Sequence, residues 1–285
     1  MNKIKVLPSF IIVGAQKCGT TTLYDILKMH PEVNMSRIKE INYFTSEDKM
    51  KKGLKHYSSY FKKPKVNHKI TGEASPGYMN NLEIPEMIKN NIGEIKIVMI
   101  LRDPIKRAFS QYWDNRRHLS EILNESEIVA KYLTDEYNSK SRGYFSRGVY
   151  SKYIEEYLKY FKRSNIHIMI FEELIDNPNK ELKKLYNFLT IDDSDKFLNL
   201  NKFSNSSMIW DNRFYKFLLQ NPKYNKYINK HFRRFFFFGK KCKYKYPLPS
   251  DINLKILQEF YKPWNLKLEL LLEKKITDWN LSNPK

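Results

Sequence analysis

The sequence predicts a single α/β domain in which helices cover both faces of a central, mainly parallel β-sheet. Short apolar runs rich in β-branched residues alternate along the chain with longer segments of helical periodicity, a pattern typical of parallel sheets. No linker rich in Gly or Ser and no internal repeat divides the 285 residues. This length suits one domain with insertions, so we expect one domain over residues 1–285.

The expected strands are four apolar runs. Residues 10–13 form a β-branched run that ends at Gly14, as a buried strand does. Residues 95–101 are the clearest candidate for a central strand, and residues 166–171 repeat the same pattern. Residues 69–71 form a shorter candidate that leads into a turn-rich segment.

The expected helices follow apolar residues that recur every three or four positions. Proline suits the first turn of a helix, so Pro104 is expected to begin the helix that follows the central strand. The expected helices cover residues 22–30, 50–61, 104–118, 149–161, 178–189 and about 252–274.

The chain carries a large excess of positive charge, with 51 Lys and Arg against 31 Asp and Glu and a formal net charge of +20. This excess favours an anionic partner, while solvated surface lysines are the alternative explanation. The two cysteines, Cys18 and Cys242, lack the spacing of metal ligands, so neither a disulfide framework nor a metal site is predicted. No segment is long and apolar enough for a signal peptide or a transmembrane helix, and we expect a cytoplasmic protein.

Residues 14–22, between the first strand and its helix, form a candidate anion-binding loop. Its two glycines let backbone N–H groups approach an anion, which the positive end of the following helix also attracts. Lys17 adds a charge, and the three threonines at 20–22 add hydroxyl groups. A Walker A loop has Lys directly after its second Gly, whereas Thr20 stands there in this chain. The sequence therefore predicts a P-loop-like site for a terminal group with less charge than the terminal phosphate of ATP.

A second anion site is predicted where the central strand ends at Arg102. Ser110 follows eight residues later, about two turns along the expected helix. Ligands of open α/β sheets bind at the carboxyl ends of the strands. We therefore expect Arg102 and Ser110 to share a phosphate, the alternative being an arginine paired with a neighbouring acid.

These two segments resemble those of sulfotransferases that use 3′-phosphoadenosine 5′-phosphosulfate (PAPS). GAQKCGTTTLYDIL is similar to the 5′-phosphosulfate loop of that family, and ILRDPIKRAFSQY is similar to its 3′-phosphate motif. Similarity to the heparan sulfate N- and 3-O-sulfotransferase branch continues in HPEVNMSRIKEINYF, GLKHYSSYF, GEASPGYM, RGVYSKYIEEYLKYFKRSNIHIMIFEEL and FYKPWNLKLELLLEKKITDWN. The order and spacing of these segments, over about residues 8–190 and 255–280, argue against a chance match.

The resemblance implies a PAPS site that needs no metal, within a cofactor-binding core of about residues 8–190. The implied contacts of the phosphosulfate are Lys17, Cys18, Gly19, Thr20, Thr21 and Thr22. Arg102 and Ser110 would bind the 3′-phosphate, with Arg147 as an additional contact.

The resemblance also implies catalytic roles. Glu40 matches the catalytic base of the family, Lys17 would stabilise the leaving group, and His118 matches a histidine of the N-sulfotransferase branch and is a second candidate base. Because an unperturbed Glu has a pKa of about 4.3, we expect burial or a nearby anion to raise the pKa of Glu40. The 3-O-sulfotransferases carry a Lys after the Glu of an EKTPAY-like segment, whereas Ala74 follows Glu73 here. Glu73 is therefore only a candidate site residue.

A basic and aromatic stretch lies within the divergent, acceptor-side segment of about residues 195–250. Residues 213–246 contain 11 Lys and Arg, no Asp or Glu, and 12 aromatic residues. This composition suits an anionic glycan whose rings stack on aromatic faces, while the alternatives are buried aromatics with solvated lysines, a nucleic acid or a membrane surface.

The sequence thus predicts a PAPS-dependent sulfotransferase (EC 2.8.2.-) that acts on a hydroxyl or amino group of a saccharide or glycan. One alternative is a P-loop nucleotide kinase or NTPase, against which the missing Gly-Lys-Ser/Thr argues. The other is a basic nucleic-acid-binding module, although no motif for nucleic acid is present and no such partner is expected. The oligomeric state stays open.

Overall fold

A five-stranded parallel sheet forms the centre of the molecule. The computed structural model describes residues 6–117, 120–121, 123–134, 142–194 and 249–279. The strands are β1 (Phe10–Gly14), β2 (Val33–Met35), β3 (Ile70–Ala74), β4 (Lys96–Leu101) and β5 (Ile166–Ile170). Their order is β2-β3-β1-β4-β5, and every neighbouring pair is parallel.

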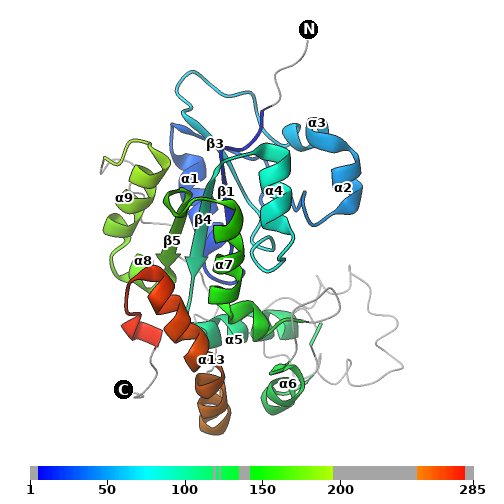
Figure 1. Ribbon diagram of the computed structural model, residues 1–285, viewed down its shortest axis with the longest axis vertical. Coiled ribbons are helices and arrows are strands. Elements are labelled where there is room, and N and C mark those ends of the chain that lie inside the picture. The colour runs from blue at the N-terminus through cyan, green and yellow to red at the C-terminus, as the bar shows by residue number, and fades with distance from the viewer. Residues whose placement is uncertain (1–5, 118–119, 122, 135–141, 195–248, 280–285) are drawn as a thin grey trace, which may run out of the picture.

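Helices cover both faces of this sheet. The helices are α1 (Thr20–Met29), α2 (Glu47–Lys51), α3 (Gly53–Ser58), α4 (Ile84–Ile92), α5 (Pro104–Arg117), α6 (Glu125–Tyr132), α7 (Tyr150–Tyr160), α8 (Phe171–Asp176), α9 (Pro178–Leu189) and α13 (Asp251–Leu272). Figure 1 shows α1 and α9 on one side of the strands and α4 and α7 on the other. The C-terminal helix α13 packs against α5 and α7. The predicted fold class, an α/β domain with a central parallel sheet, is confirmed.

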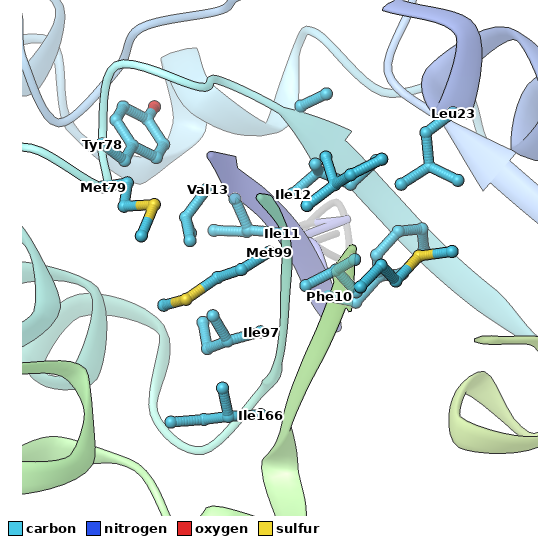
Figure 2. Packing of buried hydrophobic residues seen from close by; sticks show 14 of the residues in the cluster. Phe10, Ile11, Ile12, Val13, Leu23, Tyr78, Met79, Ile97, Met99 and Ile166 are labelled. Carbon is cyan, nitrogen blue, oxygen red and sulfur yellow. The ribbon is translucent and has the colours of Figure 1, made fainter. Parts of the chain in front are cut away.

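The central strand β1 is buried from both sides, which explains why its sequence is continuously apolar. Its side chains alternate between the two faces of the sheet, as Figure 2 shows. Phe10 and Ile12 point to the face that carries Leu23, whereas Ile11 and Val13 point to the other. The side chains of these five residues, Leu23 included, are fully buried. The core therefore fixes β1 and, with it, the loop that follows its carboxyl end.

Some elements differ from their predicted form. Neither the strand β2 nor the helices α4, α6 and α8 were expected. The single helix expected over residues 50–61 is two short helices, α2 and α3, because Gly53, the first residue of α3, adopts a left-handed φ of 71°. The expected strand over residues 69–71 extends to Ala74. The long helix near the C-terminus is present as α13, and its cap residue Glu273 has a left-handed φ of 51°.

Candidate active site

The carboxyl edge of the sheet brings three predicted segments together. Arg102, which follows β4, donates a hydrogen bond from Nη1 to the carbonyl of Lys17 in the loop after β1, at 3.4 Å. Glu40 donates its backbone N–H to the carbonyl of Ala74, the last residue of β3, at 2.8 Å. Parallel strands end at the same edge, so the anion loop, the arginine and the candidate base share one region of the fold.

The loop after β1 is shaped by two left-handed residues, Lys17 (φ 69°) and Gly19 (φ 91°). Gly19 is the N-cap of α1, and a Cβ there would lie 2.8 Å from the ring of Phe171. A glycine N-cap has no side chain to accept the first N–H groups of the helix, and the first turn of α1 contains no acidic residue. The start of α1 is therefore suited to an external anion.

The side chains of the loop lie in different environments. Thr20 and Thr22 are buried, whereas Thr21 is exposed. The thiol of Cys18 is in the core, with Sγ 3.7 Å from the hydroxyl oxygen of Tyr150, and burial raises the pKa of this thiol to about 11. Cys18 can therefore contribute to an anion site through its backbone but not as a thiolate.

Lys17 is paired with an acid that the sequence analysis missed. Its Nζ lies 3.1 Å from Oδ2 of Asp114 on α5, and both side chains are about one quarter to one third exposed, at 30% and 26%. Asp114 follows Ser110 by four residues, so the two lie on the same face of the helix. A search one helical turn beyond Ser110 would have found Asp114 as a candidate residue, but not its pairing with Lys17.

Arg102 offers a buried donor at this edge. Its guanidinium lies over the ring of Phe171, 5.1 Å from the ring centroid. Its Nε is buried and has no hydrogen-bond partner among the described residues. A buried N–H without a partner is costly, so this atom fits an anionic ligand. Ser110 is also buried, at 6% exposure, on α5.

Arg147 contacts the same loop from a distant part of the chain. It lies in a short 3-10 helix, Ser146–Gly148, and its Nη1 donates a hydrogen bond to Oε1 of Gln16, the neighbour of Lys17. A Cβ at Gly148 would lie 2.8 Å from both Pro104 and the Tyr261 hydroxyl, so only glycine allows this close packing. The packing fixes Arg147 relative to the start of α5.

Asp103 fixes the start of α5 directly after Arg102. Its Oδ1 accepts hydrogen bonds from the backbone N–H groups of Ile105 at 2.8 Å and Lys106 at 3.0 Å. The carboxyl group is buried, and this burial raises its pKa to about 6. The cap holds the strand-to-helix junction in place at the cost of a desolvated carboxyl group.

Glu40 is more exposed than expected. Its side chain is 49% exposed, and Oε1 lies 2.5 Å from Nζ of Lys39. Its backbone is left-handed, with φ 61°. The expected burial of this carboxylate is therefore not observed, and the side chain reaches solvent beside a lysine.

Glu73, in contrast, is completely buried in β3. Its Oε1 accepts a hydrogen bond from the Tyr57 hydroxyl at 2.6 Å, and its Oε2 accepts one from the Ser75 hydroxyl at 2.7 Å. Burial raises the pKa of Glu73, and these hydrogen bonds oppose the rise. Both carboxylate oxygens are engaged inside the protein.

Two predicted features, His118 and the basic stretch 213–246, lie outside the described residues. Within the described ranges, no group of three or more His, Cys, Asp and Glu side chains is placed to hold a metal ion. No helix in this part of the chain has the length and hydrophobicity needed to cross a bilayer.

Sequence comparison finds known proteins that are similar to this chain over much of its length. The family model for the sulfotransferase domain matches residues 7–267. The chain is 32% identical to mouse heparan sulfate glucosamine 3-O-sulfotransferase 5 over 193 residues, which cover 66% of this chain and 55% of that protein. It is 26% identical to mouse bifunctional heparan sulfate N-deacetylase/N-sulfotransferase 4 over 279 residues, which cover 94% of this chain and 30% of that protein. The chain thus spans about half the length, or less, of these relatives.

A solved structure supports the fold. The crystal structure of a sulfotransferase from Alicyclobacillus acidocaldarius superposes with a TM-score of 0.69 and 21% identity. The match covers 96% of this chain and 99% of that chain, so the two proteins share a fold. Because the family model covers most of the sequence, the chain belongs to the sulfotransferase domain family.

Proposed function

We propose that this protein transfers a sulfuryl group from PAPS to a hydroxyl or amino group of a saccharide. The observation that carries the proposal is the contact between Arg102 and the Lys17 loop, 3.4 Å apart, at the carboxyl edge of the sheet. It joins the two predicted anion-binding segments in a chain of the sulfotransferase family.

The described residues fit such a cofactor. The start of α1 and Lys17 would hold the 5′-phosphosulfate, since this helix end has no acid in its first turn. The buried Nε of Arg102 would face the 3′-phosphate, together with the hydroxyl of Ser110. Arg147, which contacts Gln16 beside the loop, is an additional candidate contact. PAPS, when bound, supplies the activated sulfuryl group and a bisphosphate leaving group.

Proton transfer is assigned to Glu40. As general base, its carboxylate would accept the proton of the acceptor hydroxyl or amine, and Lys39 orients it through the contact at 2.5 Å. Lys17 would stabilise negative charge on the leaving oxygen, for which its ammonium must share its contact with Asp114. His118 stays a second candidate base.

The saccharide acceptor is proposed from two observations. The curated relatives bear names of heparan sulfate N- and 3-O-sulfotransferases. The basic and aromatic composition of residues 213–246 is suited to an anionic glycan. A cytoplasmic location and independence of metal ions stay predictions.

Calorimetry tests the proposed cofactor. We expect adenosine 3′,5′-bisphosphate to bind tightly without Mg²⁺. Binding of ATP that depends on Mg²⁺, without binding of the bisphosphate, would instead identify a nucleotide kinase or NTPase. Salt-sensitive binding of oligonucleotides alone would identify a nucleic-acid-binding module.

A further inference from the structure

We infer that Glu73 is a positioning residue that holds the loop of Glu40 in place through the hydroxyl of Ser75. The loop comprises residues 40–44. The inference rests on the proposed function, because it gives Glu40 the role of base.

The loop has a backbone that needs support. Glu40 and Asn42 have left-handed φ values of 61° and 52°. Such values are uncommon for residues other than glycine and persist only where neighbouring groups hold them. The support must come from the residues that bond to the loop.

Ser75 links the loop to the buried carboxylate. The backbone N–H of Asn42 donates to Oγ of Ser75 at 3.0 Å, and the same hydroxyl donates its proton to Oε2 of Glu73 at 2.7 Å. A hydroxyl has a single proton, so its donation to Glu73 leaves the oxygen to accept from Asn42. The carboxylate therefore sets the direction of the hydrogen-bond chain.

Further contacts hold the rest of the loop. The hydroxyl oxygen of Tyr78 accepts the backbone N–H groups of Tyr43 at 2.7 Å and Phe44 at 3.3 Å. Nζ of Lys49 donates to the carbonyl of Ile41 at 2.5 Å. Glu73 itself accepts hydrogen bonds from the Tyr57 and Ser75 hydroxyls. Glu73 is thus the acceptor behind Ser75, while Tyr78 and Lys49 hold the rest of the loop.

Glu73→Gln would break this arrangement while keeping a side chain of almost the same size. Glu73 supplies two acceptor oxygens, whereas glutamine supplies one oxygen and a donating amide. The Tyr57 and Ser75 hydroxyls would then lack an acceptor for one of their protons. Glu73→Gln therefore tests the carboxylate, and Ser75→Ala tests the link with a smaller change.

The first experiment follows the loop itself by hydrogen exchange. We expect the backbone amide of Asn42 to exchange about fivefold faster in Ser75→Ala and in Glu73→Gln, because each variant removes a hydrogen bond worth about 1 kcal/mol. Ser151→Ala is the matched control, since Ser151 is equally buried and its hydroxyl has no hydrogen-bond partner among the described residues. Unchanged exchange at Asn42 in Ser75→Ala would overturn the inference, whether or not Glu73→Gln folds.

The second experiment asks whether the loop acts through Glu40. In Ser75→Ala we expect kcat to fall about tenfold, with the affinity for adenosine 3′,5′-bisphosphate within about twofold of wild type. In a Glu40→Gln background, Ser75→Ala should cause no further loss of kcat, because the base that it positions is absent. If Ser75→Ala lowers kcat by the same factor in the Glu40→Gln background as in the wild type, the positioning role is overturned. Absence of any sulfuryl transfer by the wild-type protein would refute the proposed function, while hydrogen exchange would still decide whether Ser75 and Glu73 hold the loop.

Discussion

At the scale of the residue, Lys17 of the candidate anion-binding loop forms an ion pair with Asp114. An ion pair in the loop competes with any anion that needs the same ammonium group. The Nζ to Oδ2 distance of 3.1 Å and the partial exposure of both groups indicate a pair of modest strength.

Asp114→Asn should therefore tighten the binding of adenosine 3′,5′-bisphosphate. We expect a gain of about twofold to fivefold at low ionic strength, since pairs of this kind contribute about 0.5 to 1 kcal/mol, and a smaller gain at high salt. Asp176→Asn, which removes the same charge from an exposed position on α8, is the control. Titration calorimetry at two salt concentrations measures the effect, and weaker binding in Asp114→Asn would contradict it.

The predicted effect of removing the Arg102 side chain differs between two ligands. Arg102→Ala should weaken the binding of adenosine 3′,5′-bisphosphate by about tenfold to a hundredfold, as expected for a lost charge-assisted hydrogen bond. Adenosine 5′-phosphosulfate has no 3′-phosphate and should bind almost as well as to wild type. Calorimetry with both ligands gives the comparison, and equal losses would remove Arg102 from the 3′-phosphate site.

At the scale of the element, the junction between β4 and α5 carries a stability cost. Burial of the Asp103 carboxyl raises its pKa from the ordinary value of 3.8 to about 6, because the charged form loses its solvation. The folded state therefore binds more protons than the unfolded state between about pH 4 and pH 6. As the pH rises through this window, the contribution of Asp103 to stability falls.

Asp103→Asn should keep the cap and remove this cost. An Asn oxygen can still accept the N–H groups of Ile105 and Lys106. We expect the variant to be more stable than wild type at pH 7 by up to about 3 kcal/mol, with the difference vanishing below about pH 4. Urea unfolding of both proteins at pH 7 and below pH 4 measures the difference in stability. An equal difference at the two pH values would contradict the titration of Asp103.

Strands with long apolar runs and helices with regularly spaced apolar residues could be predicted from the sequence. Shorter elements, and helices marked mainly by their end residues, were missed. β1 and β4 are long apolar runs, whereas β2 has three residues and shows no period. For α6, a usable signal was present: Asn124 and Glu127 form a capping box. α4 likewise has a proline in its first turn and ends at Gly93.

The candidate site was predictable only in part. The anion loop and Arg102 follow from local motifs at strand ends. The bond between Asn42 and Ser75 joins residues 33 positions apart, and the ion pair of Lys17 with Asp114 joins different elements. Contacts of this kind depend on tertiary packing, which a local pattern does not encode.

At the scale of the whole molecule, the parallel sheet makes a single cationic edge out of distant segments. Arg102 lies 85 positions from Lys17, and Arg147 lies 131 positions from Gln16, yet each pair is in contact. In Figure 1, α5 begins below the sheet, where β4 ends, and α13 packs against α5 and α7. A few cations of the +20 chain thus have a defined place at the carboxyl edge of the sheet.

The most direct test of the account is a mass-spectrometric assay of sulfuryl transfer from PAPS to a panel of saccharides. The wild-type protein should yield an acceptor heavier by one sulfuryl group together with an equal amount of adenosine 3′,5′-bisphosphate. Glu40→Gln should bind the bisphosphate normally but lose about 100-fold or more of the rate, as expected for a missing general base. A wild-type protein that binds PAPS but sulfates none of the saccharides, or a Glu40→Gln variant with near-normal turnover, would contradict the account.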